Sequence, residues 1–188
     1  MGVDSSRRGR AGVIAAAAMI ALALAPEAGA QPADDCARAA WPLDAARAAL
    51  AAPGVPELDS GASLHLPRAG AVALRLVPLA DAALPHAPTR PPGEPLAGVL
   101  RLSVPGPARL WQVTISAPAW VDLFVGGRPL APEAFTGVRA CPGVRKSLRF
   151  RLPAGEALLE ITDARDAGAG RLIGLTIEDV DNISPPGR

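Results

Sequence analysis

From about residue 60 onward, apolar and polar residues alternate along most of the chain. Seven segments show this period of two, and a weaker eighth lies around His65; the seven are 72–76, 100–104, 111–115, 121–125, 148–152, 159–161 and 173–177. Side chains of a β-strand point alternately to opposite faces, so each segment predicts a strand that buries one face. Together they predict an all-β domain over residues 61–179, an antiparallel β-sandwich of the jelly-roll or Greek-key type.

The connections between these segments carry further signals. Parity on the two sides of the loop 153–156 predicts a hairpin that pairs Phe150 with Leu159. The same register places Arg149 opposite Glu160, a favourable charge pair.

Glycine and proline mark two other connections. Gly126-Gly127 after Val125 predicts a tight turn. Residues 84–95 contain five prolines, which predicts an extended loop and not a strand.

Residues 31–60 have a different pattern. An alanine-rich stretch with apolar residues three and four apart predicts a short helix near residues 43–51, which Pro53-Gly54 ends. At the other end of the chain, residues 180–188 are polar and finish in Pro185-Pro186-Gly187-Arg188, so we expect a flexible tail there.

The first 30 residues have the three parts of a secretory signal peptide. Arg7, Arg8 and Arg10 precede an apolar run at 11–25, and Ala28-Gly29-Ala30 supplies the small residues of a cleavage site. The run is shorter than the roughly 20 residues of a membrane anchor, and no later segment is long and apolar enough to span a bilayer. We therefore expect cleavage after residue 30 and a bacterial protein that is periplasmic or secreted.

Two cysteines, Cys36 and Cys141, fall in the mature part of the chain. In an oxidising compartment they predict one disulfide. A bridge that closes a loop of roughly 100 residues is worth about 4–5 kcal/mol in the chain-entropy model.

The mature chain has balanced charges. Residues 1–30 carry three of the 19 basic and two of the 18 acidic residues, which leaves 16 of each. A chain without net charge has no general attraction for nucleic acid or for acidic membranes.

Some local motifs resemble a known family. They are a hairpin between the strands of Leu102 and Trp111, AWVDL at 119–123, CPGVRKS at 141–147 and FRLPAG at 150–155. The stretch 98–177 resembles small exported proteobacterial domains with a sandwich fold like the bacterial pre-peptidase C-terminal domain. Similar chains are sometimes named homogentisate 1,2-dioxygenase, which would imply a metal-dependent enzyme with a mononuclear iron site.

The residues themselves do not suggest catalysis. An iron site of that kind needs about two histidines and one carboxylate, and the chain holds only His65 and His86, with no carboxylate at a ligand-like spacing. No Gly-x-Ser-x-Gly elbow is present either. We predict no catalytic residue, no metal and no cofactor.

Two groups of residues are candidate binding features. Arg139, Arg145 and Lys146 flank Cys141, with Arg149 and Arg151 close by, and this group could hold an anionic ligand such as an acidic sugar or a phosphate; the alternative is a solvated strand face paired with Glu160. Trp120, Asp122 and Phe124 share the outer face of one strand and could stack on sugar rings, unless another strand or the helix near residue 41 covers them.

These features favour an exported binding or accessory module without catalytic activity of its own. Its partner would be a cell-envelope glycan or a periplasmic protein. The metal-dependent enzyme and a purely structural envelope protein are the alternatives.

Overall fold

The computed structural model describes residues 35–165, 167–168 and 170–182. The predicted signal peptide and residues 183–188 of the predicted tail lie outside this range. The helices are η1 (Asp35–Arg38), α1 (Asp44–Ala51), η2 (Leu79–Asp81) and η3 (Val180–Asn182). The strands are β1 (Glu57–Leu58), β2 (Ser63–His65), β3 (Ala71–Arg75), β4 (Val77–Pro78), β5 (Leu96–Val104), β6 (Arg109–Ile115), β7 (Trp120–Val125), β8 (Arg128–Pro129), β9 (Ala134–Gly137), β10 (Lys146–Leu152), β11 (Gly155–Thr162) and β12 (Leu172–Asp179).

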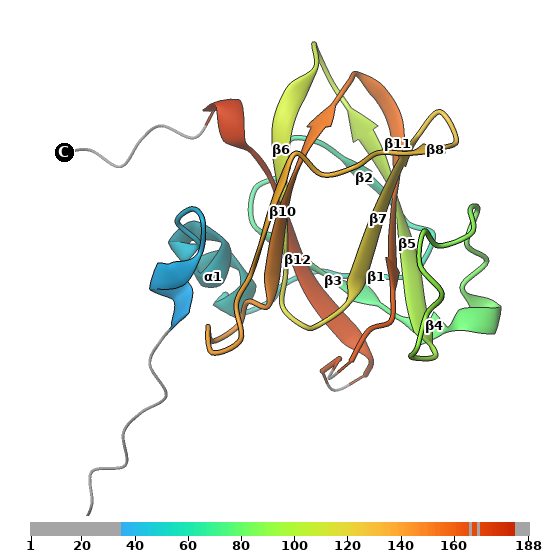
Figure 1. The fold of residues 1–188 in the computed structure, drawn as a ribbon, viewed down its shortest axis with the longest axis horizontal. Coiled ribbons are helices and arrows are strands. Elements are labelled where there is room, and N and C mark those ends of the chain that lie inside the picture. Colours follow the sequence, from blue (N-terminus) through green and yellow to red (C-terminus); the bar gives the residue numbers. More distant parts are fainter. Residues whose placement is uncertain (1–34, 166, 169, 183–188) are drawn as a thin grey trace, which may run out of the picture. The chain divides into compact units, whose positions relative to one another are not determined.

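The strands form two sheets that face each other (Figure 1). Sheet A has the order β1-β3-β12-β6-β10-β9, and sheet B has the order β2-β5-β11-β7-β8, with β4 paired to β5. The predicted all-β sandwich with a short N-terminal helix is therefore confirmed. The first strand, β1, precedes residue 61, where we expected the sandwich to begin.

Two strand pairs depart from the expected antiparallel arrangement. β1 runs parallel to β3, and β2 runs parallel to β5, so both sheets are mixed. These two parallel strands are two and three residues long and lie at the sheet edges. The sequence pattern reports which residues face inward but not the direction of the neighbouring strand.

The hairpin predicted between residues 148–152 and 157–161 is wrong. β10 pairs with β6 and β9 in sheet A, whereas β11 pairs with β5 and β7 in sheet B. The chain crosses from one sheet to the other between the two strands, so Phe150 and Leu159 belong to the same core but to opposite sheets. Arg149 and Glu160 consequently do not pair.

The hairpin expected between the strands of Leu102 and Trp111 is wrong for the same reason. β5 belongs to sheet B and β6 to sheet A, and the two strands do not pair. Parity of apolar residues is equally consistent with pairing inside one sheet and with packing across two sheets.

The turn predicted at Gly126-Gly127 is confirmed. It joins β7 to β8 with Val125 opposite Arg128, and both glycines have positive φ, 56° and 76°. Two residues with positive φ form the type I′ turn that matches the twist of paired strands, and glycine adopts it without steric cost.

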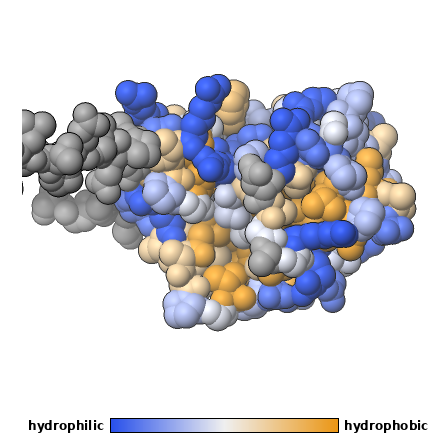
Figure 2. Space-filling model, turned by 90° about the horizontal axis from the view of Figure 1, so that it is seen from below, coloured by the Kyte–Doolittle hydropathy of each residue, from blue (hydrophilic) through white to orange (hydrophobic). Residues whose placement is uncertain are grey.

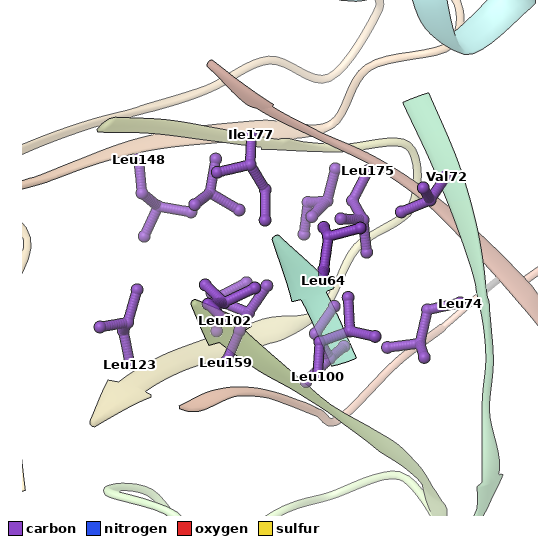
Figure 3. Packing of buried hydrophobic residues seen from close by; sticks show 14 of the residues in the cluster. Leu64, Val72, Leu74, Leu100, Leu102, Leu123, Leu148, Leu159, Leu175 and Ile177 are labelled. Atoms are coloured by element: carbon purple, nitrogen blue, oxygen red, sulfur yellow. The ribbon is translucent and has the colours of Figure 1, made fainter. Parts of the chain in front are cut away.

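The core lies between the sheets and is almost entirely aliphatic (Figure 3). Leu74 from β3, Leu100 from β5 and Leu159 from β11 are fully buried there. Trp111 and Phe150 are the largest buried side chains. Each buried aliphatic side chain contributes about 1.5–3 kcal/mol relative to exposure, which accounts for the regular one-sided pattern of the strands.

The N-terminal segment packs on the outer face of sheet A as a second, smaller core. Trp41 and Leu43 contact Val138 and Val144, and the indole Nε1 of Trp41 donates to Ser147 Oγ at 3.2 Å. The predicted Cys36–Cys141 disulfide is present, with the two Cα atoms 4.8 Å apart. The segment and the loop before β10 are thus joined both covalently and by packing.

Candidate functional site

One pocket of about 630 Å³ lies at the end of the sandwich where β7 and β10 begin. We call it the basic pocket, because five basic residues and one acidic residue line it: Arg90, Arg139, Arg145, Lys146, Arg165 and Asp163. The loop before β10 lies at the lower end of the domain in Figure 1, which Figure 2 views directly. At this end, hydrophilic side chains interrupt the apolar surface (Figure 2).

Trp120, the first residue of β7, forms one wall of the pocket. Its indole Nε1 donates to Asp122 Oδ1 at 2.9 Å and to Thr89 Oγ1 at 3.0 Å. The Arg90 guanidinium lies 4.6 Å from the centre of the indole ring, and the Lys146 ammonium lies 5.5 Å from it. These cation–π contacts hold two positive charges beside the ring.

The loop between β9 and β10 is fixed at several points. Besides the disulfide at Cys141, the backbone N–H groups of Arg139 and Ala140 donate to Asp35 Oδ2 at 2.8 and 3.2 Å. These hydrogen bonds, that of Arg139 above all, lower the pKa of Asp35. Arg145 donates from its guanidinium to the carbonyl of Arg139. The loop therefore presents its cations from a constrained backbone.

The segment 84–95 and the residues that follow β11 supply further lining residues. Asp163 follows β11 with φ of 53° and binds the guanidinium of Arg90, the N–H of Gly93 and, at 3.6 Å, the guanidinium of Arg165. Burial acts to raise the pKa of Asp163, but Arg165 and Arg90 outweigh it, so the pKa is lowered. This buried carboxylate organises two of the five cations.

Lys146 is partly buried beside the other cations of the pocket. Its ammonium donates to the carbonyl of Ala119 at 2.7 Å and is only partly accessible. Burial and the neighbouring Arg90 lower the pKa of Lys146, and Asp163 opposes them only in part. A negatively charged ligand would relieve this electrostatic cost.

The structure places Trp120, Arg139, Arg145 and Lys146 together in the basic pocket. In the sequence these four residues belong to two separate features, the basic residues beside Cys141 and the outer face of one strand. The prediction from sequence missed Arg90 and Arg165, which lie in irregular segments far apart in the sequence and carry no local signal.

Asp122 and Phe124 do not line the basic pocket, because residues 84–95, the proline segment, cover the outer face of β7. Thr89 donates to Asp122 through its N–H at 2.9 Å and through Oγ1 at 2.6 Å. The His86 ring stacks on Phe124 with ring centres 4.4 Å apart. Both residues are buried, so they do not form the open stacking surface that their alternation suggested.

Glu160 lies under the same segment, opposite Asp122 in the register of β11 and β7. Its side chain is completely buried, Oε1 accepts the N–H of His86 at 3.2 Å, and Oε2 has no partner among the described residues. Burial raises the pKa of Glu160, and the His86 hydrogen bond opposes it.

The remaining basic residues near Cys141 lie on β10 and contact side chains outside the basic pocket. Arg149 lies over the Trp41 ring at 4.1 Å and donates to Gln112 Oε1, and Arg151 pairs with Glu133. The alternative in which this group pairs with Glu160 is therefore wrong.

The two histidines lie apart. His65 is exposed on β2, whereas His86 lies over Phe124 on β7, and β5 and β11 separate these strands in sheet B. Neighbouring strands are about 4.8 Å apart, so the histidines do not converge on one point. Among the described residues, no group of three or more His, Cys, Asp or Glu side chains could hold a metal ion. No helix in the described part of the chain has the length and hydropathy to cross a bilayer.

No family model, curated protein or solved structure matches this chain. The resemblance to pre-peptidase C-terminal-like domains and the dioxygenase name therefore stay expectations.

Proposed function

We propose that this protein is an exported binding module without catalytic activity, whose basic pocket binds an anionic group of a cell-envelope partner. The observation that carries the proposal is the convergence of five cations on a pocket whose lining holds one carboxylate, Asp163; Glu94, outside the lining, pairs with Arg165 at 3.4 Å. The pocket volume falls within the range of about 300–1,000 Å³ typical of ligand sites.

The charge of the pocket stands out because the chain as a whole has a formal net charge of only +1. Arginine offers a planar fork of donors that suits carboxylates and phosphates. Arg139 and Arg145 are both exposed, and the disulfide and Asp35 constrain the loop that carries them. Such preorganisation reduces the entropy that binding has to overcome.

An extracytoplasmic location fits the disulfide, because disulfides persist mainly in oxidising compartments. Delivery to the periplasm or beyond by the signal peptide at residues 1–30 belongs to the same proposal. It is tested by sequencing the N-terminus of protein recovered from the periplasmic fraction. A mature chain that begins near Gln31 is the expected result, and an uncleaved chain in the cytoplasm would contradict it.

Binding is tested by calorimetric titration of the mature protein with inorganic phosphate, an oligogalacturonate and an aspartate-rich peptide. The double variant Arg139→Gln and Arg145→Gln should weaken binding of the retained probes at least tenfold, about 1.4 kcal/mol. Higher salt should also weaken binding, because exposed charges are screened.

The matched control removes two positive charges elsewhere, with Arg101→Gln on β5 and Arg128→Gln on β8, both exposed. It should bind the probes as the wild type does. Failure of all three probes to bind, or equal weakening in both double variants, would refute the basic pocket as the binding site.

A further inference from the structure

β9 is the last strand of sheet A, and β10 covers only one of its edges. The N–H of Val138, next to β9, donates to the carbonyl of Arg145 at 3.0 Å. Backbone groups of an antiparallel ladder alternate in direction along the strand. Those of Thr136 therefore also face β10, whereas those of Phe135 and Gly137 face the free edge. No other strand of the described chain pairs there.

This edge also carries exposed apolar surface. Phe135 is 70% exposed and is the one exposed large hydrophobic residue in the described part of the chain. Proteins usually protect an edge strand with charge, proline or a covering segment. β9 has the sequence Ala-Phe-Thr-Gly, which contains none of the protecting residues.

The edge and the basic pocket form one continuous surface, because Phe135 and Gly137 themselves line the pocket. An extended chain that pairs with β9 would therefore run along the rim of the pocket formed by Phe135 and Gly137, next to Arg139. Its backbone would meet unpaired donors and acceptors, and its side chains would meet a phenyl ring and an excess of positive charge.

We propose that the ligand is an extended acidic peptide segment of a partner protein, which adds to β9 as a further strand of sheet A and places its carboxylates in the basic pocket. This inference rests on the proposed function and names the ligand class of the same site. Strand addition supplies affinity through main-chain hydrogen bonds and leaves specificity to alternate side chains.

The same contacts argue against the other occupants. A sugar does not present the regularly spaced main-chain N–H and C=O groups that pair with a strand edge, and the ring of Trp120 is already covered by Arg90 and Lys146, with its Nε1 engaged twice. A second copy of this chain paired through β9 would bring two positively charged pockets close together, which like-charge repulsion disfavours.

The test uses a capped eight-residue peptide of alternating valine and aspartate, titrated into the mature protein. Two further peptides carry N-methyl groups on all valine amides or on all aspartate amides. Amides two residues apart point to the same edge of a strand, so only one of these sets can face β9. One methylated peptide should bind at least tenfold more weakly, and the other should bind like the parent.

Gly137→Pro provides the complementary change on the protein. It removes the outward N–H of Gly137 and no hydrogen bond to β10, and a Cβ at this position meets no atom within 4 Å. Binding of the parent peptide should weaken about tenfold, whereas the more weakly binding methylated peptide should lose no further affinity, because its pairing with β9 is already removed. Circular dichroism verifies that the variant is folded. Phe135→Ala leaves the backbone unaltered and should weaken binding of the parent peptide severalfold.

The outcomes separate the two proposals. Equal affinities for all three peptides, or tighter binding of an oligogalacturonate than of the parent peptide, would overturn strand addition while the anionic site stands. A dimer formed through β9 in sedimentation, which Phe135→Ala dissolves, would also overturn it. If neither peptide nor phosphate nor oligogalacturonate binds, the proposed function itself fails.

Discussion

The disulfide makes a quantitative prediction about stability. Cys36 and Cys141 are 105 residues apart in the sequence, so the bridge removes the closure entropy of a long loop from the unfolded chain. The chain-entropy model assigns about 4.7 kcal/mol to a loop of this length. Since the free energy of unfolding of a domain is about 5–15 kcal/mol, the double variant Cys36→Ala and Cys141→Ala should lose a third of it or more.

Urea denaturation followed by tryptophan fluorescence measures this loss. With a slope of about 2 kcal/mol per molar urea, the midpoint of the transition should fall by about 2 M. Cys141 is buried, so its replacement also removes some packing, and the observed loss should not be smaller than the entropic one. A loss below about 1 kcal/mol would refute the reasoning.

A second variant separates the loop entropy from packing of the N-terminal segment. Trp41→Ala keeps the bridge but removes the largest side chain of the small core and its hydrogen bond to Ser147. It should cost about 3–5 kcal/mol if the segment is packed as described. If the double cysteine variant does not fold while Trp41→Ala does, the disulfide contributes more to the free energy of unfolding than the packing of Trp41, which would agree with the prediction.

Three further predictions concern the packing of the sheets. Burial raises the pKa of Glu160, so this carboxyl binds a proton more firmly in the folded protein than in the unfolded chain. The protonated carboxyl therefore favours the folded state. This contribution to the free energy of unfolding is fully present below about pH 4.5 and is lost as the pH rises through the pKa of the folded state. Glu160→Gln should therefore raise the melting temperature progressively from acidic to neutral pH, and a difference that does not change with pH would contradict the burial of this carboxylate. Gly174→Ala should cost about 1–3 kcal/mol in urea denaturation, because its Cβ would lie 2.8 Å from Leu50 Cδ2 and 3.2 Å from Ser116 Oγ; Leu50→Ala should relieve the part of that cost due to Leu50, and equal losses in both backgrounds would exclude the Leu50 clash. Asp122→Ala removes both hydrogen bonds to Thr89, so hydrogen exchange of the Thr89 amide should accelerate at least tenfold while that of Leu100 stays slow; unchanged exchange at Thr89 would show that other contacts hold the proline segment.

The strands, the turn at Gly126-Gly127 and the disulfide could be predicted because their signals are local or have one solution. Alternation reports which side chains are buried, two glycines in sequence accept positive φ, and two cysteines allow one pairing. The choice of partner strand is not local. Phe150 and Leu159 satisfy the same parity whether they pair within a sheet or pack across the core, and the structure has them in different sheets.

The candidate site was predictable only in part for a related reason. Basic residues beside a cysteine are visible in the sequence, but Arg90 reaches Trp120 through the path of the proline segment, which no periodicity describes. A buried carboxylate such as Asp122 looks like an exposed one, because both occupy polar positions of an alternating strand. Proline in the segment 84–95 excluded a strand there but gave no sign that the segment covers sheet B.

The central claim is that the basic pocket binds anionic ligands, and Trp120 reports on it directly. The chain has three tryptophans, so a ¹H–¹⁵N spectrum of the mature protein contains three indole signals, and Trp120→Phe identifies the one from the pocket. Titration with the alternating valine–aspartate peptide should shift the Trp120 signal in a saturable, salt-sensitive manner and leave those of the buried Trp41 and Trp111 in place. No shift of the Trp120 signal with any anionic probe, or an equal shift of all three signals, would contradict the account.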